Sequence, residues 1–567
     1  MKKYQVVCLS IIFLAIFCVN IRFLNMKSGY YVDEGMTLFL SNGHYNGAVT
    51  SKSDYGVGSF IKAYITKEGD GPVQVIRNVW GMLNELVQAG NYSNEGTVKW
   101  YDDARRMLQG STQWISGDAL FREMVAEKGE RFQYAQVYLN QIMDVHPCFY
   151  YFLVHTVFSI FSGIYSDSFL FGLNFIFLIM TCLVMYCMVK EYLKDERAAL
   201  LSVVLFGFSQ GFASCAMYFR MYAVLTFFVV LTLYLHFKLL TVGIETDDKE
   251  KMKGMSIAVL LGFNTHYYYI LFLFPLFLLT CVWIRKKRML FRCYVKNMIR
   301  TGTVSLIVWP FSAYHIFFGY RGTEAASNIL SDGFLKRLYG YVSELGIAFF
   351  GNTFWFGIVL VLTSAVACMV VWQRACENRG AILALTIPCA VYFVFIAQIA
   401  PTVSDRYIMC LFPCMSIFTS LALSQITGML CNKRIQTIVL SVFGIVYVLL
   451  GLGLAVPNYL YLEQRGKELQ IQGNKEEYHC VMLGFDHGQG FPVALKLAEF
   501  DQVLVAGRQE IDCVTAPEHT DKGIVVYVYE GLEIEDCLRA LENNMGLNMS
   551  YVELDSDIAD FKAFVYD

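Results

Sequence analysis

The sequence contains few charged residues for its length. Asp, Glu, Lys and Arg make up 16% of the 567 residues and hydrophobic residues 56%, whereas soluble globular proteins carry about 25% charged residues. No long basic run is interleaved with aromatic residues and the formal net charge is −3, so a nucleic-acid partner is not expected. Internal repeats and low-complexity segments are also absent. The composition is therefore that of a membrane protein.

The chain also lacks a Cys-x-x-Cys pair, although it contains 17 cysteines. Many of them lie inside apolar blocks, namely Cys182, Cys187, Cys281, Cys368 and Cys389. Buried cysteine usually behaves as a small hydrophobic residue, so neither a metal cluster nor a disulfide framework is predicted. Three others lie in the polar C-terminal part: Cys480, Cys513 and Cys537. The sequence does not decide whether two of these oxidise to a disulfide.

Long apolar blocks predict a mainly α-helical, polytopic membrane bundle, because about 18 consecutive apolar residues suffice for a spanning helix. The first block, residues 6–23, follows two lysines but lacks the small residues of a cleavage site, so an uncleaved first span is expected. Further spans are predicted at residues 168–189, 198–216, 221–240, 255–266, 267–284, 303–318, 346–372, 381–400, 407–430 and 436–456. The total is eleven crossings.

The basic residues predict the orientation of these spans, because short cytoplasmic loops are enriched in Lys and Arg. Residues 285–300 hold seven basic residues and no acidic one, the strongest cytoplasmic signal in the chain. Four further cytoplasmic loops are marked by Lys190, Lys194 and Arg197; Lys249, Lys251 and Lys253; Arg374 and Arg379; and Lys433 and Arg434. With eleven crossings these loops alternate, so the N-terminus is predicted to be cytoplasmic and the C-terminus extracytoplasmic.

A short apolar segment at residues 148–163 is predicted to lie along the outer membrane surface. It is shorter than the roughly 20 residues needed to span, and its mixture of Tyr150, Tyr151 and His155 with apolar residues suits an interfacial helix. Length alone does not decide this, because residues 255–266 are equally short. The loop charges decide it, since another crossing here would turn residues 285–300 outward.

The remaining regions define the predicted domains. Residues 1–456 form the transmembrane domain, which includes a long outer loop at 25–147 and a shorter one at 319–345. Residues 457–567, called the tail below, contain short apolar runs and one helical pattern, which predicts a small soluble α/β domain outside the membrane. These runs cover residues 480–485, 502–505, 523–529 and 561–566. The tail shows no glycine-rich phosphate loop.

Asp33 and Glu34 follow the first predicted span on the outer face. One interpretation is a general base that takes a proton from an acceptor hydroxyl. The other is a solvated loop, or a cap for a helix that begins at Gly35. From the residues alone the second interpretation is favoured, because acidic dipeptides are common in loops.

His146 precedes Pro147 and Tyr150 at the start of the short interfacial segment. Proline is favoured in the first helical turn, and the histidine could contact an anionic headgroup or cap the helix. Arg220 and Tyr222 begin a predicted span at the outer face. An arginine at this depth either binds an anion or extends toward lipid phosphate.

His266 and Tyr267 lie in a tight outer turn between two predicted spans, where an interfacial belt of tyrosines is the simpler interpretation. Arg406 and Tyr407 begin another span, and Arg406 could pair with Asp405 or hold a phosphate. Together these motifs place carboxylates, histidines, arginines and tyrosines on one face. An enzyme acting on an anionic lipid at the outer leaflet needs such a set.

The order of the motifs resembles the GT-C glycosyltransferases of the protein O-mannosyltransferase type, which include the aminoarabinose transferase that modifies lipid A. The order is Asp-Glu after the first span, His-Pro-x-x-Tyr-Tyr, Arg-Met-Tyr, Thr-His-Tyr, and Arg-Tyr before a span with proline. This resemblance covers residues 4–456. Its five ordered motifs are more specific than any one alone.

The resemblance implies that a sugar on a polyprenyl phosphate is transferred to an acceptor hydroxyl at the outer leaflet, with inversion. Asp33 would be the base, and Glu34 would position the acceptor or help to bind a divalent cation. The donor and its phosphate would be bound by His146, Tyr150, Arg220, Tyr222, His266, Tyr267, Arg406 and Tyr407. The acceptor stays open between a glycan, a lipid and a protein.

The chain departs from the family pattern at several positions. Tyr218 stands where the family often has Glu, and Cys148 stands where it has a second proline. The first outer loop is also longer than usual, and its middle, residues 51–130, is expected to form a helical insertion for acceptor recognition. The alternatives are a flippase or transporter for a lipid-linked glycan and an inactive scaffold. Ionisable residues gathered at one face, rather than at midspan, favour the enzyme over a transporter.

Overall fold

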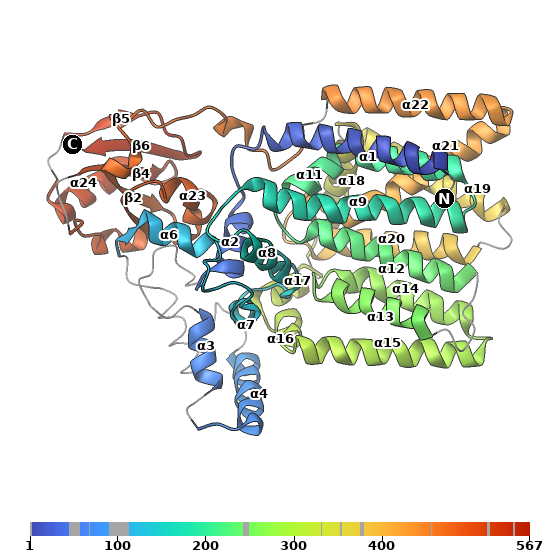
Figure 1. Ribbon diagram of the computed structural model, residues 1–567, viewed down its shortest axis with the longest axis horizontal. Coiled ribbons are helices and arrows are strands. Elements are labelled where there is room, and N and C mark those ends of the chain that lie inside the picture. The colour runs from blue at the N-terminus through green and yellow to red at the C-terminus, as the bar shows by residue number, and fades with distance from the viewer. Residues whose placement is uncertain are drawn as a thin grey trace. The chain divides into compact units, whose positions relative to one another are not determined.

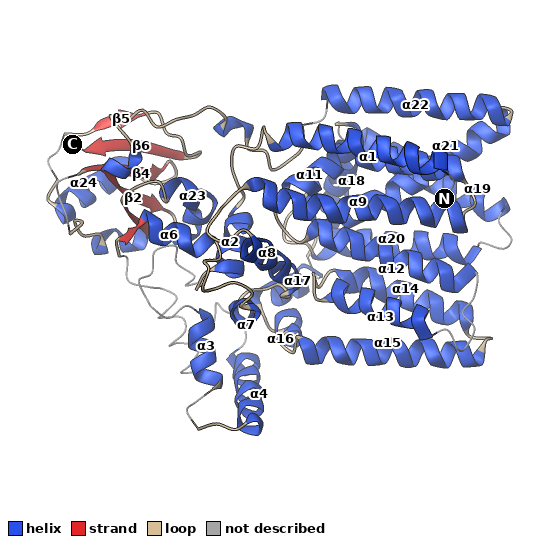
Figure 2. Ribbon diagram, viewed as in Figure 1, coloured by secondary structure: helices blue, strands red, loops and turns tan. Residues whose placement is uncertain are grey.

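The computed structural model describes residues 3–44, 57–66, 69–89, 113–241, 249–329, 331–351, 354–374, 379–454, 456–518, 522–547 and 550–566. The chain folds into two compact units. The helical unit comprises Met1–Asn25 and Phe171–Asn458, and the loop–tail unit comprises Met26–Leu170 and Tyr459–Asp567. Figure 2 shows the strands in the loop–tail unit.

The helical unit is a bundle in which α12, α14 and α20 pack against one another (Figure 1). Its helices are α1 (Lys3–Leu24), α9 (Asp167–Tyr192, which begins in the other unit), α10 (Glu196–Gly207), α11 (Gln210–Met217), α12 (Tyr222–Thr241), α13 (Lys249–Phe263), α14 (Tyr269–Ile284), α15 (Arg288–Val308), α16 (Ser312–Phe317), α17 (Tyr320–Ile329), α18 (Phe334–Phe350), α19 (Phe354–Arg374), α20 (Arg379–Ile399), η2 (Asp405–Tyr407), η3 (Met409–Leu411), α21 (Phe412–Leu430) and α22 (Lys433–Leu454).

Six helices of the described residues are long and apolar enough to cross a membrane, namely α1, α9, α12, α20, α21 with η3, and α22. Two bent pairs, α10 with α11 and α18 with α19, bring the number to at most eight if each pair forms one span. The chain is therefore a membrane protein, but the predicted eleven crossings are not confirmed. Two predicted spans, α13 and α14, have only 15 and 16 residues, which is short of the roughly 20 needed.

The predicted span at residues 198–216 is broken into α10 and α11, which are bent by 54°. Ser209 lies at the break, where its hydroxyl donates to the Phe206 carbonyl and accepts from the Phe212 amide at 3.0 Å. A serine that satisfies the first free amide of a new helix is a typical N-cap. Hydropathy did not reveal the bend, because both halves are apolar.

The basic segment at residues 285–300, predicted as a loop, is mostly helical. Helix α15 begins at Arg288 and contains a buried stripe at Leu290, Tyr294 and Met298. Residues four apart share one helix face, so this stripe packs inward while the basic residues stay on other faces. Lys and Arg are good helix formers. A high density of basic residues therefore does not show that a segment is a loop.

The predicted span at residues 303–318 is also wrong. Helix α15 ends at Val308, and the separate short helix α16 follows after Trp309, Pro310 and Phe311. Proline has no amide hydrogen and its ring clashes with the preceding turn, so it ends or kinks a helix. The apolar run therefore belongs to two helices.

The loop–tail unit contains a six-stranded sheet with the order β1-β3-β2-β4-β6-β5. The strands are β1 (Ile115–Ser116), β2 (Tyr478–Gly484), β3 (Gln502–Gly507), β4 (Gly523–Tyr529), β5 (Val552–Leu554) and β6 (Phe561–Tyr566). The helices are α2 (Val32–Asn42), α3 (Val57–Ile65), α4 (Pro72–Ala89), α6 (Gly117–Met124), α7 (Tyr134–Asn140), η1 (Gln141–Met143), α8 (Phe149–Ile160), η4 (Leu462–Gln464), η5 (Lys475–Glu477), η6 (His487–Val493), α23 (Ala494–Leu497), η7 (Arg508–Cys513) and α24 (Ile534–Met545). Strand β2 is parallel to β3 and β4, and the other pairs are antiparallel. The predicted α/β tail is confirmed.

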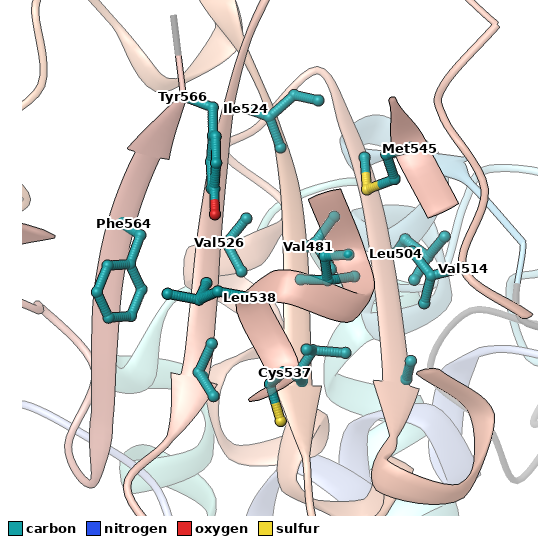
Figure 3. Packing of buried hydrophobic residues seen from close by; sticks show 14 of the residues in the cluster. Val481, Leu504, Val514, Ile524, Val526, Cys537, Leu538, Met545, Phe564 and Tyr566 are labelled. Carbon is teal, nitrogen blue, oxygen red and sulfur yellow. The ribbon is translucent and has the colours of Figure 1, made fainter. Parts of the chain in front are cut away.

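One face of the sheet carries an apolar core that α24 covers (Figure 3). Val481, Val526 and Leu538 in this core are at most 2% exposed, and each side chain of this kind contributes about 1.5–3 kcal/mol when fully buried. Cys537 belongs to the same core. Cys480 precedes Val481 and faces the opposite side of the sheet, because successive strand residues alternate. These two cysteines therefore do not pair.

The first strand of the sheet comes from the long loop rather than from the tail. Ile115 of β1 pairs with Val503 of β3, and the neighbouring Trp114 donates its indole N–H to the Thr515 carbonyl at 2.8 Å. The fold thus unites chain segments that the predicted boundary at residue 456 assigns to different domains. The physical reason is that the edge of β3 presents free backbone groups that another strand can pair with.

The predicted helical insertion at residues 51–130 is described only in part. Its described portions include α3, α4 and α6, together with β1. Residues 51–56, 67–68 and 90–112 of that prediction lie outside the described residues. Its role in acceptor recognition stays a prediction.

Opposite the apolar core, the tail holds a buried charged cluster around Asp557. Its carboxylate accepts hydrogen bonds from Lys475 at 2.8 Å and from the Tyr527 hydroxyl at 2.7 Å. Burial raises the pKa of Asp557, but the contacts with Lys475 and Tyr527 outweigh it, so the pKa lies below its usual value. A depressed carboxyl pKa stabilises the fold above the unfolded pKa of about 3.9, and this contribution is lost as the pH falls through the folded pKa.

We expect Asp557→Ala to lower the free energy of unfolding by about 3 kcal/mol at neutral pH, because it breaks a buried ion pair. Tail opening can be followed by thiol labelling of the buried Cys480 in the full-length protein. The control is Glu553→Ala, which removes an exposed pair with Lys562 and should cost at most about 1 kcal/mol. Equal labelling rates in the two variants would contradict the prediction.

Candidate active site

Helix α2 carries the acidic pair and begins directly before it. Tyr31 is the N-cap, and the Glu34 carboxylate reaches back to accept the Tyr31 amide at 2.7 Å. A glutamate at the third helical position commonly caps a helix in this way. Asp33 and Glu34 thus lie in the first turn, where the positive end of the helix dipole favours carboxylates.

Glu34 forms a buried ion pair with Lys27. The two charged groups are 3.1 Å apart, and their side chains are 1% and 0% exposed. Lys27 also donates to the Tyr459 carbonyl at 2.8 Å and lies 5.1 Å from the centre of the Tyr30 ring. Glu34 and Lys27 therefore tie the start of α2 to the segment that begins the tail.

This arrangement does not fit a divalent cation at Asp33 and Glu34. The Lys27 ammonium already supplies the positive charge beside the Glu34 carboxylate, and a metal ion there would be repelled by it. Among the described residues, no group of three His, Cys, Asp or Glu side chains is placed to hold a metal ion. We therefore derive no role for a metal from these residues.

Asp33 differs from its neighbour in exposure. Consecutive helical residues project about 100° apart around the axis, so Asp33 and Glu34 point in different directions. Glu34 is 2% exposed, whereas Asp33 is only partly buried. Its backbone carbonyl accepts the Thr37 hydroxyl at 2.8 Å, which continues the helix. Of the two residues, Asp33 is the more exposed.

His146 contacts an acidic residue that the sequence reasoning missed. Its Nδ1 lies 3.0 Å from Asp144 Oδ2, and the same oxygen accepts the Tyr151 hydroxyl at 3.2 Å. Asp144 therefore orients the imidazole ring. The sequence signal that could have identified Asp144 is its position two residues before His146, directly ahead of Pro147. Tyr150 is fully buried, and its ring meets the Tyr151 ring edge-on at 6.1 Å.

The polar residues of α8 face the protein rather than a membrane surface. Tyr150, Tyr151 and His155 are at most 2% exposed, and the Nε2 of His155 accepts the Gln133 amide at 3.0 Å. Burial lowers the pKa of His155. These three side chains are therefore no evidence for an interfacial helix, because they are buried in contacts within the loop–tail unit. The interfacial location itself stays a prediction.

In the helical unit, Arg406 is held by two tyrosine hydroxyls. Its Nη1 donates to the Tyr218 hydroxyl at 2.9 Å and its Nη2 to the Tyr407 hydroxyl at 3.0 Å. The guanidinium also lies 4.9 Å from the centre of the Tyr407 ring, within cation–π range. In the family that this chain resembles, the position of Tyr218 is often Glu. The Tyr218 hydroxyl accepts a hydrogen bond from Arg406. Because the hydroxyl is neutral, it leaves the positive charge of the arginine in place, whereas a glutamate would neutralise it.

A chain of aromatic rings surrounds this arginine. Tyr218 stacks on Tyr222 at 5.6 Å, and Tyr222 lies 5.5 Å from His266. His266 lies 4.8 Å from Tyr268, which lies 5.8 Å from Tyr407. The fold thus brings together the predicted residues Tyr222, His266 and Tyr407 through Tyr218 and Tyr268. The sequence did not predict Tyr218 or Tyr268 as donor-binding residues, although both lie inside the motifs that carry the resemblance.

Arg220 and Tyr267 have different surroundings. Arg220 is 3% exposed, and its backbone amide donates to the Tyr218 carbonyl at 2.7 Å. The Tyr267 hydroxyl accepts the Trp309 indole N–H at 2.8 Å and lies 2.8 Å from His315 Nδ1. Tyr267 therefore belongs to a second polar cluster. Its predicted contact with the donor stays a prediction.

The predicted site residues fall into two sets. The loop–tail unit holds Asp33, Glu34, His146 and Tyr150, and the helical unit holds Arg220, Tyr222, His266, Tyr267, Arg406 and Tyr407. Within each unit the fold supplies a distinct chemistry. One set offers an accessible carboxylate and an Asp-oriented histidine, and the other an arginine with aromatic walls, which suits an anionic group.

One part of this chain matches the model of a known protein family. Residues 145–315 match the family model described as dolichyl-phosphate-mannose-protein mannosyltransferase. This segment contains His146, Arg220 and His266. This part of the chain therefore resembles the protein O-mannosyltransferases, as the motif order predicted. No curated protein shows significant sequence similarity to the chain.

Three solved structures are similar to this chain. ArnT from Cupriavidus metallidurans bound to undecaprenyl phosphate matches with a TM-score of 0.49 and 11% identity, over 74% of this chain and 87% of that one. The same protein in the apo state gives a TM-score of 0.46 and 10% identity, with coverage of 74% and 87%. The Archaeoglobus fulgidus oligosaccharyltransferase complex with Zn and sulfate gives 0.41 and 12%, with coverage of 71% and 62%.

Proposed function

We propose that this protein is a membrane glycosyltransferase that moves a sugar from a polyprenyl-phosphate donor to an acceptor hydroxyl, with inversion. The observation that carries the proposal is the family match over residues 145–315. The candidate residues support it, because a partly exposed carboxylate and a partly buried arginine are groups that this reaction can use. The donor class is taken from the family resemblance.

Asp33 is proposed as the general base. As the acceptor hydroxyl attacks the anomeric carbon, its proton passes to the Asp33 carboxylate, and the new carbon–oxygen bond forms. The bond from the anomeric carbon to the phosphate oxygen breaks, and the polyprenyl phosphate leaves with the electron pair. A single base suffices for this one-step inversion. The ionised carboxylate is the form that accepts a proton.

Arg406 is proposed to bind the donor phosphate. A phosphate leaving group needs stabilisation of its negative charge more than protonation, and positioned donors supply this. The planar guanidinium can donate to two phosphate oxygens at once, and its contacts with Tyr218 and Tyr407 hold its orientation. Arg220 and the surrounding aromatic residues of the helical unit complete the proposed donor site.

The proposal is tested with purified protein in lipid nanodiscs and a panel of synthetic polyprenyl-phosphate sugars. Release of polyprenyl phosphate, together with a glycosylated product found by mass spectrometry of surface glycans and lipids from cells with and without the protein, would support it. Movement of the lipid-linked sugar across liposome membranes without any sugar transfer would overturn it in favour of a flippase.

The proposed orientation has the N-terminus in the cytoplasm and the tail outside. Cys513 is exposed in the tail, so a membrane-impermeant maleimide should label it in intact cells. The buried Cys480 and Cys537 provide internal controls, since they should react only after unfolding. Labelling of Cys513 that requires cell lysis would place the tail in the cytoplasm.

We expect Arg406→Lys to raise the KM for the donor about 10- to 100-fold, because lysine keeps the charge but loses the two-pronged donor. The KM is measured by donor-dependent transfer. Arg197→Lys is a matched control. The Arg197 guanidinium donates a hydrogen bond to the Thr437 hydroxyl at a predicted cytoplasmic loop, so this variant should keep the parental KM for the donor. A donor KM unchanged in Arg406→Lys would remove this arginine from the phosphate site.

A further inference from the structure

The chain enters the loop–tail unit twice, after α1 and again after α22. The two entering segments, residues 26–31 and residues 459–461, lie side by side. The Ser28 amide donates to the Leu460 carbonyl at 2.7 Å, and the Leu460 side chain is 2% exposed. We call residues 459–461 the strap. The strap is the first part of the tail, and it is bonded to the segment that leads directly into α2.

The backbone of the strap is strained. Tyr459 has a φ of 68° and Tyr461 a φ of 54°. Residues other than glycine rarely adopt this left-handed conformation, and for bulky side chains it is a genuine outlier. Such conformations persist only where the surrounding contacts enforce them, and they gather at functional sites. The contacts that hold the strap therefore indicate what it does.

These contacts centre on the buried ammonium of Lys27. The ammonium donates to the Tyr459 carbonyl at 2.8 Å and pairs with Glu34 at 3.1 Å. It also lies 5.1 Å from the centre of the Tyr30 ring and 5.8 Å from the centre of the Tyr461 ring. Both distances are within cation–π range. A carbonyl, a carboxylate and two aromatic rings thus surround one positive charge.

The two rings are held in place by different means. The Tyr30 hydroxyl donates to the Asp167 carboxylate at 2.7 Å, and the same oxygen accepts the Tyr165 hydroxyl at 2.7 Å. The Tyr461 ring is placed by a close approach to the backbone instead. A Cβ atom at Gly29 would lie 2.9 Å from the Tyr461 Cβ, so a larger residue at position 29 would displace the strap.

The ammonium connects the strap with the helix that carries Asp33. The Glu34 carboxylate that pairs with Lys27 also accepts the Tyr31 amide at 2.7 Å, and this bond caps α2. Asp33 is the second residue of the same helix. Burial raises the pKa of Tyr461, and the charges of Glu34 and, to a smaller extent, Asp33 raise it further. The Tyr461 side chain therefore lies within electrostatic range of both carboxylates.

We propose that Tyr461 is a positioning residue of the candidate active site, and that it acts through Lys27 on the helix that carries Asp33. Its ring holds the ammonium beside Glu34, and Glu34 in turn fixes the first turn of α2. The importance of this contact for sugar transfer rests on the proposed function, whereas the hold on α2 does not. The tail thereby contributes a side chain to the arrangement of the site.

The test changes both sides of the contact in the full-length protein in nanodiscs. Tyr461→Leu removes the ring, and Gly29→Ala pushes the strap away. Each should lower kcat at least about tenfold, because a small displacement of a reacting group is costly. The donor KM should stay unchanged, since the proposed phosphate site lies in the helical unit. Tyr461→Phe keeps a ring for the ammonium, so its kcat should stay within about twofold of the parental value.

Hydrogen exchange measures the hold on α2 without any need for activity. Amides in peptides covering residues 30–42 should exchange faster in Tyr461→Leu and in Gly29→Ala, because local opening becomes easier. Two controls should match the parent in exchange and in kcat. Gly129→Ala adds a Cβ atom that meets nothing within 4 Å, and Tyr551→Leu replaces a tail tyrosine that is 41% exposed.

The outcomes separate this inference from the proposed function. Parental exchange and parental kcat in both Tyr461→Leu and Gly29→Ala, in a protein that transfers sugar, would overturn the inference and keep the proposed function. An equal loss of kcat in Tyr461→Phe and Tyr461→Leu would also overturn it, because the hydroxyl rather than the ring would then matter. Faster exchange of α2 in both variants of a protein that transfers no sugar would keep the hold on α2 and reject the transferase.

Discussion

Asp33→Asn is expected to reduce sugar transfer at least about 100-fold, the contribution that a positioned general base makes. Asparagine has nearly the same shape but cannot accept the proton of the acceptor hydroxyl at its amide nitrogen. The helix start should persist, because its cap is provided by Glu34 and Tyr31. The measurement is the initial rate of donor-dependent transfer at equal amounts of folded protein.

The matched control is Asp118→Asn. Asp118 also lies in the first turn of a helix in the same loop, and its side chain is 69% exposed in a pair with Arg122. This variant should transfer sugar at the parental rate. If Asp33→Asn retained most of the parental activity, Asp33 would lose the role of base, and the Asp144–His146 pair would be the next candidate.

Glu34→Gln is expected to destabilise the protein by about 3–5 kcal/mol, because it leaves a buried ammonium without its counter-ion. The Lys27 side chain is 0% exposed, so water cannot replace the lost carboxylate. Lys27→Met should destabilise the fold similarly, for the converse reason. The change appears as a lower thermal unfolding midpoint of the purified protein.

The double variant Lys27→Met with Glu34→Leu distinguishes a structural role from a catalytic one. Replacing a whole buried ion pair by apolar residues is often neutral or stabilising, so most of the lost stability should return. If transfer returns as well, Glu34 acts through the fold. A stable Glu34→Gln variant without activity would instead show that Glu34 takes part in substrate binding or catalysis.

Hydropathy identified the long apolar helices because a spanning helix is a local property of the chain. It did not determine the number of crossings. The bend at Ser209 and the end of α15 before Pro310 arise from capping and from a missing amide hydrogen, which an average over many residues does not register. The strands at residues 523–529 and 561–566 were predicted with the bounds they have, since short apolar runs between turns carry a clear signal.

The sequence by itself determined that this is a membrane protein, that a small α/β fold follows the helices, and that motifs resembling a glycosyltransferase family occur in order. These features depend on composition and on short segments. Only the tertiary structure distinguished the roles of Asp33 and Glu34, because Glu34 alone forms a buried ion pair with Lys27. It also revealed that β1 joins the tail sheet and that Tyr218 holds Arg406. These are contacts between residues distant in the chain, and no local pattern specifies them.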